Sequence, residues 1–436
     1  MAELLYGYSG RRGQAAMKVL VVCQYFAPEN FRINELVAGL VERGHQVTVL
    51  TGQPNYPSGR FFDGYGWFGP RFEHLFGADV VRVPLFPRGN GGGLRLMLNY
   101  LSFAFFGCLA ALFRLKGKFD AIFVCQLSPV TMGLPGLVAA HRFRCPVLFW
   151  VLDLWPDSLV ATGAVRNPVI LKWVGALVSS IYRRCTRILV QSHAFEQDVL
   201  ARGGVREQIR YFPNWIEREY EALALGEKPE PWPEPLPKGF RIVYAGNIGA
   251  AQDFPSLLDA MSLVARRCPE VSWVIAGDGR MAAWARNTVA ERGLSDRVVF
   301  LGQHPSAKMP ALFVEADALL LSLAPNPVFA RTVPGKLQSY LAAGKPVLAM
   351  IDGEGARVVQ EIGGGLACRG GDVDGLVDNI AHLIAMSPDE REKMGRRGRE
   401  FALEEFRRDA LFSRLDDWMV ELVPGARMGT EQKNKI

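Results

Sequence analysis

The sequence lacks paired cysteines and clustered histidines. Its seven cysteines are scattered, odd in number and mostly embedded in apolar runs, and none forms a CxxC pair. We therefore expect reduced cysteines inside a cytoplasmic protein, without a disulfide framework or a zinc site. None of the six histidines lies at metal-ligand spacing with another, and no Ser/His/Asp set emerges. We accordingly predict no metal site and no nucleophilic triad.

The sequence also lacks a strong excess of one charge. A net charge of +6 fits a phosphate-bearing ligand or an anionic membrane face but requires neither. Basic residues cluster at Arg396, Arg397 and Arg399 alone, on a polar helical stretch of the kind that faces water. Because nucleic-acid binding calls for a concentrated basic stripe, we exclude nucleic acid as a partner.

Two further absences concern the N-terminal part of the chain. Residues 1–16 lack the continuous apolar segment of a secretory signal, and we interpret them as a disordered leader or a misplaced start before the first strand at Met17. The formula GxGxxG is missing after that strand, which disfavours a nicotinamide-dependent dehydrogenase.

Alternating strand-like and helix-length segments fill the rest of the chain. At 436 residues the chain is too long for one core. The alternation predicts two α/β, Rossmann-like domains with parallel sheets, at 17–226 and 240–404, and a C-terminal helix and tail at 405–436. Residues 227–239 hold five prolines among charges and are interpreted as a linker. We expect a ligand-binding cleft between the carboxyl ends of the two sheets.

An uncharged apolar segment lies between Arg95 and Arg114. It is long enough to span a membrane, but it separates two strands expected in one sheet, so spanning is disfavoured. Two alternatives remain: a core helix, or an apolar helix lying among lipid headgroups. Residues 169–184 combine a similar apolar body with a basic end. This pair favours a protein peripheral to the inner face of the cell membrane, whose leaflet is anionic.

Three expected strands of the second domain end in glycine-containing turns at the same edge of the sheet. Such turns present backbone amides to a phosphate or bring the backbone close to a nucleotide. Each is also explained by a tight strand-to-helix turn, so only their combination indicates a nucleotide site. The candidate binding residues are Gly246, Asn247, Gly249, Gln252, Gly277, Asp278 and Gly302, together with Gly335 and Ser339 of the following turn and helix.

A fourth turn, VPGKLQSYLAAGKPVL, places Lys336 in the first turn of a helix that begins at Pro334 or Gly335. The helix dipole disfavours a cation at this position by a few tenths of a kcal/mol to about one. A bound diphosphate would reverse that sign, because the lysine and the helix amides would share one anion, and Arg331 could join them. The alternative is a solvated surface lysine.

In the first domain, Asp153 follows an apolar strand and is placed to act on a substrate hydroxyl; the alternative is a turn carboxylate. For Asp157 a helix cap is the alternative to chemistry. The proline-containing loops at residues 25–30 and 53–59 follow the first two strands. We expect these loops to form the walls of an acceptor pocket.

Taken together, these motifs resemble glycosyltransferase family 4, and within it the WbuB-like branch associated with bacterial surface polysaccharides. The resemblance extends from Met17 to about Val423. It depends on ELVAGLVERGHQVTVLTGQPNYPSG, VLDLWPDS, VYAGNIGAAQDFPSLLDA, VIAGDG, and VPGKLQSYLAAGKPVLA with the following DGEGA. It implies the GT-B fold, with a nucleotide-sugar donor on the second domain and an acceptor on the first.

The resemblance further implies a retaining, metal-independent sugar transfer without a cofactor, in which the enzyme positions the sugar and stabilises the leaving diphosphate. Lys336 then resembles a diphosphate clamp, Gly249 part of a phosphate loop, and Asp153 the polar group beside the reacting sugar. The implied acceptor is a polyprenyl-diphosphate-linked saccharide at the cytoplasmic membrane, in exopolysaccharide or O-antigen-type polysaccharide biosynthesis.

The sequence departs from the family at several charged positions. The usual pair of glutamates corresponds to Arg331 and Ser339, and the usual arginine and lysine correspond to about Asn247 and Gln252. Arg331 and Lys336 are candidates for the missing positive charge, and Glu354 for a carboxylate near the sugar. Two other functions remain open: a nucleotide-sugar epimerase of the same fold, and a non-catalytic two-domain binding protein.

Overall fold

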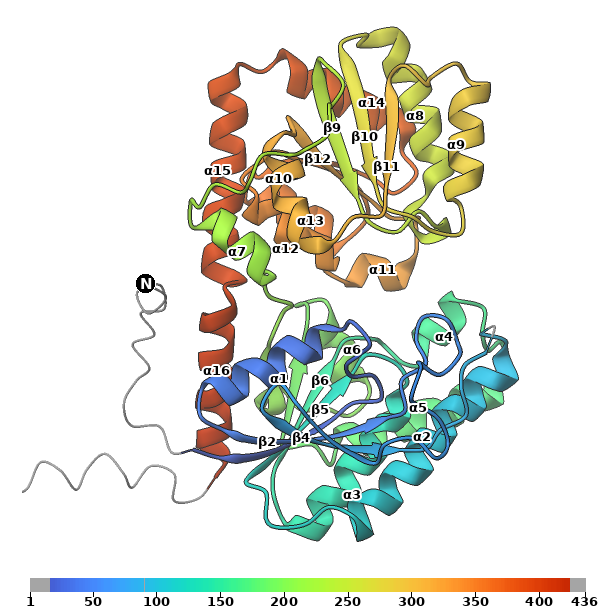
Figure 1. Ribbon diagram of the computed structural model, residues 1–436, viewed down its shortest axis with the longest axis vertical. Coiled ribbons are helices and arrows are strands. Elements are labelled where there is room, and N and C mark those ends of the chain that lie inside the picture. The colour runs from blue at the N-terminus through green and yellow to red at the C-terminus, as the bar shows by residue number, and fades with distance from the viewer. Residues whose placement is uncertain (1–15, 90, 424–436) are drawn as a thin grey trace, which may run out of the picture. The chain divides into compact units, whose positions relative to one another are not determined.

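The computed structural model describes residues 16–89 and 91–423 (Figure 1). The leader expected at residues 1–16 lies outside the described residues except for residue 16. The chain divides into two compact units. The first comprises the described residues up to Gln191, together with Phe195–Phe212 and the segment from Phe412 onward, and the second comprises Ser192–Ala194 and Pro213–Leu411. We describe each unit by itself.

The first unit is built on an eight-stranded sheet with the order β3-β4-β2-β1-β5-β6-β7-β8. Strand β3 pairs antiparallel with β4, and the other neighbours pair parallel. The strands are β1 (Lys18–Val22), β2 (Gln46–Gly52), β3 (Phe72–Leu75), β4 (Ala78–Val83), β5 (Ala121–Gln126), β6 (Val147–Val151), β7 (Arg187–Val190) and β8 (Ile209–Tyr211).

Helices cover both faces of this sheet (Figure 1). On one face α2 (Gly93–Phe113), α3 (Gly133–Phe143) and α5 (Pro168–Tyr182) contribute to a large apolar core. On the other, α1 (Arg32–Glu42) is joined by the last helix, α16 (Arg408–Leu422), which approaches it so closely that a Cβ at Gly39 would lie 2.2 Å from the Phe412 ring. Shorter helices are α4 (Asp157–Ala161) and α6 (Phe195–Ala201).

The second unit contains a fully parallel six-stranded sheet with the order β11-β10-β9-β12-β13-β14. Its strands are β9 (Phe240–Ala245), β10 (Val271–Ala276), β11 (Val298–Gly302), β12 (Ala318–Ser322), β13 (Val347–Met350) and β14 (Gly365–Cys368). Separate apolar clusters fill its two faces. This confirms the expected fold of two parallel-sheet α/β domains.

The helices of the second unit divide between these two clusters. Helices α8 (Phe254–Arg267), α9 (Ala282–Glu291) and α14 (Val373–Ala385) belong to one. The other includes α7 (Arg218–Ala224), α10 (Met309–Val314), α12 (Gly335–Ala342), α13 (Glu354–Glu361) and α15 (Pro388–Glu405). A short helix, α11 (Pro327–Arg331), precedes α12.

The unit boundary differs from the expected one. The chain enters the second unit at Pro213, before the proline-rich segment 227–239, because Tyr220 and Trp232 are buried in the second unit's core. Residues 388–422 form two helices, interrupted after Glu405 where Phe406 is fully buried. From Phe412 onward the second of these helices belongs to the first unit. Proline content alone therefore does not locate the boundary.

Helix α2 fits neither of the two expected alternatives completely. It is long and apolar enough to cross a membrane by length and composition, yet 39% of its most apolar window is buried in the protein. Ala104, Gly107 and Ala111 lie on its buried side, and a Cβ at Gly107 would contact Pro135 of α3. The opposite side is exposed. The helix therefore belongs partly to the core and partly to the surface.

The attachment of α16 to the first unit includes a buried carboxylate. Asp416 is 1% exposed and accepts hydrogen bonds from Arg43 and His45, each at 3.1 Å. We predict that Asp416→Ala lowers the free energy of unfolding by about 3–5 kcal/mol, because it removes the carboxylate that pairs with the half-buried Arg43 and the buried His45. Chemical denaturation measures this loss.

The matched control is the pair His74–Asp79, which has the same 3.1 Å separation but exposed side chains. Asp79→Ala should change the free energy of unfolding by less than about 1 kcal/mol, because exposed pairs contribute little. Equal effects of the two substitutions would contradict the assignment of Asp416 as a buried anchor.

Candidate functional site

Lys336 occupies the second position of α12, whose first residue is Gly335. Its Nζ donates to the Tyr244 hydroxyl at 3.0 Å and lies 4.3 Å from the centre of the Tyr244 ring. The structure records no ion pair between Lys336 and a carboxylate among the described residues. Burial lowers the pKa of Lys336 to about 8. Lys336 is half-buried in the structure, so it is a partly desolvated cation and not the solvated surface lysine of the alternative interpretation.

A glycine makes this arrangement possible. Gly246 follows β9 directly, and a Cβ at this position would lie 2.2 Å from the Lys336 Nζ. Its φ of +138° is also a conformation that side chains rarely adopt. Any larger residue at position 246 would displace the ammonium group. Gly246 thus admits the lysine to the carboxyl end of β9.

Tyr340 fixes the position of α12 against the same strand. Its hydroxyl accepts from the Ala245 amide at 2.9 Å and donates to the Ala245 carbonyl at 3.1 Å. Tyr340 follows Lys336 by four residues, so both side chains leave the same face of the helix. The buried tyrosine therefore holds the lysine at the strand end.

The turns after β9, β10 and β11 are joined through their backbones. Gly246 donates to the Ala276 carbonyl at 2.8 Å, Gly277 to the Gly302 carbonyl at 2.7 Å, and Ile248 to the Asp278 carbonyl at 2.9 Å. A Cβ at Gly277 would lie 1.9 Å from the Gly246 carbonyl oxygen, so only glycine fits there. The structure brings these three turns together at one edge, as expected.

The loop after Gly246 carries no positive charge. Asn247 Nδ2 donates to the Gln252 Oε1 at 2.9 Å, so these two residues form a neutral amide pair. Gly249 lies directly beside this pair. In the described part of the chain, the backbone amides of Gly249 and Ala250 have no acceptor. Free amides of this kind can bind an anion.

Arg331, Lys336 and Glu354 lie on elements that meet. A Cβ at Gly353, just before α13, would lie 1.9 Å from the Ala330 carbonyl oxygen of α11, and one at Gly355 would lie 2.9 Å from Pro334. The end of α11 and the starts of α12 and α13 therefore converge. Ser339, another candidate on α12, is buried in the middle of the helix.

The side chains of Arg331 and Glu354 already have partners. The Arg331 Nε donates to the Pro327 carbonyl at 3.0 Å. The Glu354 carboxylate forms a bidentate interaction with Arg357, accepting from Nε at 3.0 Å and from Nη2 at 2.6 Å. A sugar that used either group would compete with these contacts, so their predicted roles are less directly supported than that of Lys336.

Asp153 lies in the first unit, two residues after β6. Its Oδ2 accepts from the Trp155 indole at 3.0 Å, and burial raises its pKa. The neighbouring Asp157 is the first residue of α4 and pairs with Arg202 at 3.1 Å. Asp157 is therefore not the helix cap given as its alternative, because the N-cap residue of α4 is Pro156; the side chain of Asp157 instead forms an ion pair with Arg202. Asp153 is a carboxylate held by an indole rather than by a cation.

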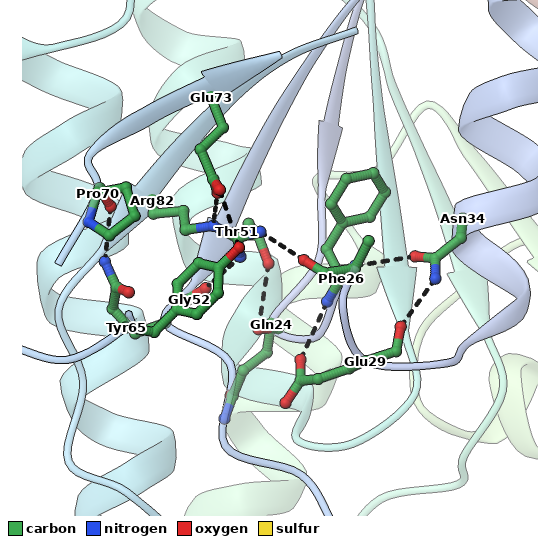
Figure 2. Close-up of polar contacts among 12 residues, drawn as sticks. Gln24, Phe26, Glu29, Asn34, Thr51, Gly52, Tyr65, Pro70, Glu73 and Arg82 are labelled. Atoms are coloured by element: carbon green, nitrogen blue, oxygen red, sulfur yellow. Dashed lines mark hydrogen bonds and ion pairs between the residues drawn. The ribbon is translucent and has the colours of Figure 1, made fainter. Parts of the chain in front are cut away.

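The loops after β1 and β2 are joined by a buried carboxylate. Glu29 accepts backbone N–H bonds from Phe26 at 3.2 Å, from Asn55 at 2.8 Å and from Tyr56 at 2.7 Å. Figure 2 shows it beside Phe26, with Asn34 donating to the Glu29 carbonyl. Burial raises the pKa of Glu29 to about 7 despite these bonds.

A buried arginine joins the same two loops to β4. Arg82 is fully buried and donates to the Gly52 carbonyl at 3.1 Å and to the Ala27 carbonyl, and its Nε contacts Glu73 (Figure 2). Glu29 and Arg82 therefore fix the two loops that the sequence predicted as walls of an acceptor pocket.

Sequence reasoning missed Tyr244, Tyr340, Glu29 and Arg82. A signal existed for Tyr340, because it follows Lys336 by one helical turn. Glu29 was also visible as an acid inside a proline-shaped loop after an apolar strand. For Tyr244 and Arg82 we found none, because each is one member of an apolar strand and acquires its polar contacts from segments distant in sequence. Among the described residues, no group of three His, Cys, Asp or Glu side chains could hold a metal ion.

Comparison with known proteins identifies the class of protein. Residues 30–215 match the family described as "Glycosyl transferase 4-like domain", and residues 239–386 match "Glycosyl transferases group 1". Two parallel-sheet units of this kind define the GT-B fold. The chain belongs to glycosyltransferase family 4 and is a glycosyltransferase.

Two curated relatives are similar in sequence. The putative colanic acid biosynthesis glycosyl transferase WcaI of Escherichia coli is 25% identical over 75% of this chain and 82% of its own length. A GDP-mannose-dependent phosphatidylinositol monomannoside mannosyltransferase of Mycobacterium tuberculosis is 26% identical over 53% of this chain and 54% of its own length.

Two solved structures share the fold. Anabaena HepE in complex with UDP superposes with a TM-score of 0.63 at 15% identity, covering 93% of this chain and 100% of HepE. Sucrose-phosphate synthase from Thermosynechococcus elongatus gives a TM-score of 0.67 at 17% identity, covering 93% and 99% of the two chains. At these identities the likeness concerns the fold alone.

Burial of Lys336 predicts a characteristic dependence of stability on pH. Its pKa in the folded protein, about 8, lies below its ordinary value of 10.5, so between these values the unfolded chain binds more protons and stability rises with pH. We predict that Lys336→Met is at least as stable as the wild type at pH 7. The wild type should gain stability relative to the variant as the pH rises from 8 towards 10.5.

Denaturant titrations at several pH values measure this difference, with substitution of the exposed Lys308 by methionine as the control. A Lys336→Met protein that is less stable than the wild type at pH 7, with a difference that does not change with pH, would contradict the description of Lys336 as a desolvated cation.

Proposed function

We propose that this chain is a retaining, metal-independent glycosyltransferase that uses a nucleotide-sugar donor. The acceptor is a polyprenyl-diphosphate-linked saccharide, and the pathway is exopolysaccharide or O-antigen-type polysaccharide biosynthesis. The observation that carries the proposal is Lys336, a half-buried cation that has no carboxylate partner among the described residues. A protein keeps such a group where an anionic ligand offsets its desolvation.

The donor diphosphate is the anion that fits this place. The diphosphate would contact the Lys336 ammonium and the first amides of α12. The helix dipole, which disfavours the lysine cation alone, would favour this anion. The free amides of Gly249 and Ala250 supply further donors. HepE, which shares the fold, was solved with UDP and with UDP-glucose. This supports a nucleotide-sugar donor on the second unit.

Catalysis in this proposal is mainly stabilisation of the leaving group. As the bond between the sugar and the diphosphate lengthens, negative charge grows on the diphosphate, and the contact with Lys336 strengthens. Positive charge grows on the sugar carbon, where Asp153 or Glu354 is the candidate carboxylate. The acceptor hydroxyl then forms the new bond on the same face of the sugar.

The apolar surface of the first unit supports a lipid-linked acceptor. Eight large apolar side chains of α2 are exposed: Leu94, Met97, Leu98, Leu101, Phe105, Leu109, Leu112 and Phe113. In α5, Val169, Ile170 and Trp173 are exposed as well, the last by 74%. Neither helix contains an acidic residue. We call the exposed side chains of α2 and α5 the apolar surface; it has the character of an interfacial membrane helix pair.

The names of the relatives point in the same direction. WcaI is named for biosynthesis of a surface polysaccharide, and the mycobacterial relative is named for a reaction on a phosphatidylinositol glycolipid. We accordingly propose that the protein is cytoplasmic and binds peripherally to the inner face of the cell membrane, where it meets its acceptor.

A transfer assay with membranes and labelled UDP- and GDP-sugars tests the function. We predict transfer of label into the lipid fraction with at least one donor. Lys336→Ala should lower turnover by about tenfold or more, because one charge-assisted phosphate contact of about 1.5–3 kcal/mol is lost. Lys336→Arg, which keeps the charge, should retain more activity than Lys336→Ala.

Absence of transfer from every donor would refute the proposal, and so would conversion of the donor to an epimer without any acceptor. Near-wild-type turnover of Lys336→Ala, with Lys308→Ala as the matched surface control, would remove Lys336 from the site.

Binding to vesicles tests the apolar surface separately. We predict that the double substitution Phe105→Asp with Trp173→Asp lowers binding to anionic vesicles by tenfold or more, since it replaces apolar contacts with charges that the lipid repels. Co-sedimentation measures binding. Trp284→Asp, which changes an exposed tryptophan of the second unit, should leave it unchanged, and equal effects would contradict the proposal.

A further inference from the structure

Three aromatic rings meet at the carboxyl edge of the first unit's sheet. Tyr25 stacks on Phe31 with centroids 5.2 Å apart, and Tyr56 lies 5.9 Å from Tyr25 and 5.2 Å from Phe31. Tyr25 and Phe31 come from the loop after β1, and Tyr56 from the loop after β2. We call these three residues the aromatic cluster. Tyr25 is buried, whereas Tyr56 is 38% exposed, so the cluster has an accessible edge.

Arg88, from the segment after β4, lies over this cluster. Its guanidinium carbon is 5.1 Å from the Tyr56 ring centre and 5.8 Å from that of Tyr25, and Nη1 donates to the Tyr25 hydroxyl at 3.3 Å. The Arg88 amide donates to the Asn55 side chain at 3.1 Å. Both the backbone and the side chain of Arg88 are therefore held in place without a ligand.

The charge of Arg88 is not used within the protein. The structure records no ion pair between Arg88 and a carboxylate in the described part of the chain. The buried carboxylate of the same loops, Glu29, accepts hydrogen bonds from the amides of Phe26, Asn55 and Tyr56. A guanidinium fixed over aromatic rings, with N–H groups to spare, is suited to the oxygen atoms of a phosphate.

Other polar groups beside the cluster also lack partners. The buried Gln24 donates to Asn99 at 2.6 Å and approaches the Tyr25 hydroxyl at 3.5 Å, but its Oε1 has no partner among the described residues. On the neighbouring strand, both amide atoms of the buried Gln126 are without partners there as well. Buried polar atoms normally have partners, so the same edge offers contacts to hydroxyl groups or water.

The apolar surface begins next to Arg88. A Cβ at Gly89 would lie 2.6 Å from Nη1 of Arg95, so the Arg95 side chain packs on the residue that follows Arg88. Arg95 is in the first turn of α2, between the exposed Leu94 and Met97. The apolar helix α2, the two arginines Arg95 and Arg88, and the aromatic cluster are thus adjacent to one another in the first unit.

We propose that Arg88, assisted by Arg95, binds the diphosphate of a lipid-linked acceptor. Its hydrocarbon chain would lie along the α2 part of the apolar surface, and its first sugar against the aromatic cluster, whose rings can stack on the apolar face of a sugar. This inference rests on the proposed function, because it identifies the site at which the acceptor of that reaction is held.

Vesicle binding of the full chain tests the site without relying on turnover. The probe is geranylgeranyl diphosphate, included at a few mole per cent in phosphatidylcholine vesicles, which carry no net charge themselves. Control vesicles contain phosphatidylglycerol in place of the diphosphate lipid, in the amount that gives the same total charge. We expect tighter binding to the diphosphate vesicles, and a loss of about tenfold or more in Arg88→Ala, as for one charge-assisted contact.

Two further variants keep the test decisive. Arg88→Lys keeps the charge without the planar fork and should bind with intermediate affinity, and Arg88→Met keeps an apolar stem on the rings and should bind as weakly as Arg88→Ala. Lys116→Ala, which removes a charge just beyond the other end of α2, should bind as the wild type. Unchanged affinity in Arg88→Ala and Arg88→Met would overturn the proposal.

Two outcomes distinguish an acceptor site at Arg88 from a general phospholipid contact and from a failure of the proposed function. An equal loss on phosphatidylglycerol vesicles would mean that Arg88 binds any phospholipid headgroup, which would overturn the acceptor assignment. In the transfer assay, Arg88→Ala should raise the KM for the lipid acceptor and leave the KM for the donor unchanged. A wild type that transfers no sugar would refute the proposed function, whereas an active Arg88→Ala with an unchanged acceptor KM would refute the site alone.

Discussion

The burial of one lysine without a carboxylate partner is the constraint around which the second unit is arranged. Gly246 must be glycine to admit the ammonium group, and Tyr340 must bind both polar groups of Ala245 to hold α12 at the strand end. Tyr244 provides a hydroxyl and a ring face in place of an anion. None of these contacts neutralises the charge. The folded protein therefore carries the free-energy cost of desolvating this ammonium group, and in the proposed function a bound diphosphate would offset that cost.

In the first unit, by contrast, the charged side chains that fix the loops are already engaged in hydrogen bonds within the protein. Glu29 takes three backbone amides and Arg82 takes backbone carbonyls, so the loops after β1 and β2 keep their shape without a ligand. Arg88 is the exception at this edge, because its guanidinium rests on aromatic rings. Unused positive charge at a strand edge is thus what marks a candidate phosphate site in each unit.

The alternation of apolar strands and helices was sufficient to predict two α/β domains and the glycine-bearing edge of the second sheet. The start of α12 at Gly335 and the unusual position of Lys336 were also visible, because helix ends and dipoles are local properties. The unit boundary was not, since Tyr220 and Trp232 are buried by residues distant in sequence. The engagement of Glu354 by Arg357 was equally hidden: the two are one helical turn apart, but only the structure shows which partner Glu354 takes.

The most direct measurement is proton uptake on binding of a nucleoside diphosphate. Lys336 has a pKa of about 8 without ligand, and a bound diphosphate would raise it, so binding near pH 8.5 should draw a proton from solution. Calorimetric titration with UDP or GDP in buffers of different ionisation enthalpy measures that proton. The account predicts uptake by the wild type and none by Lys336→Met. Binding without uptake, or the same uptake in both proteins, would contradict it.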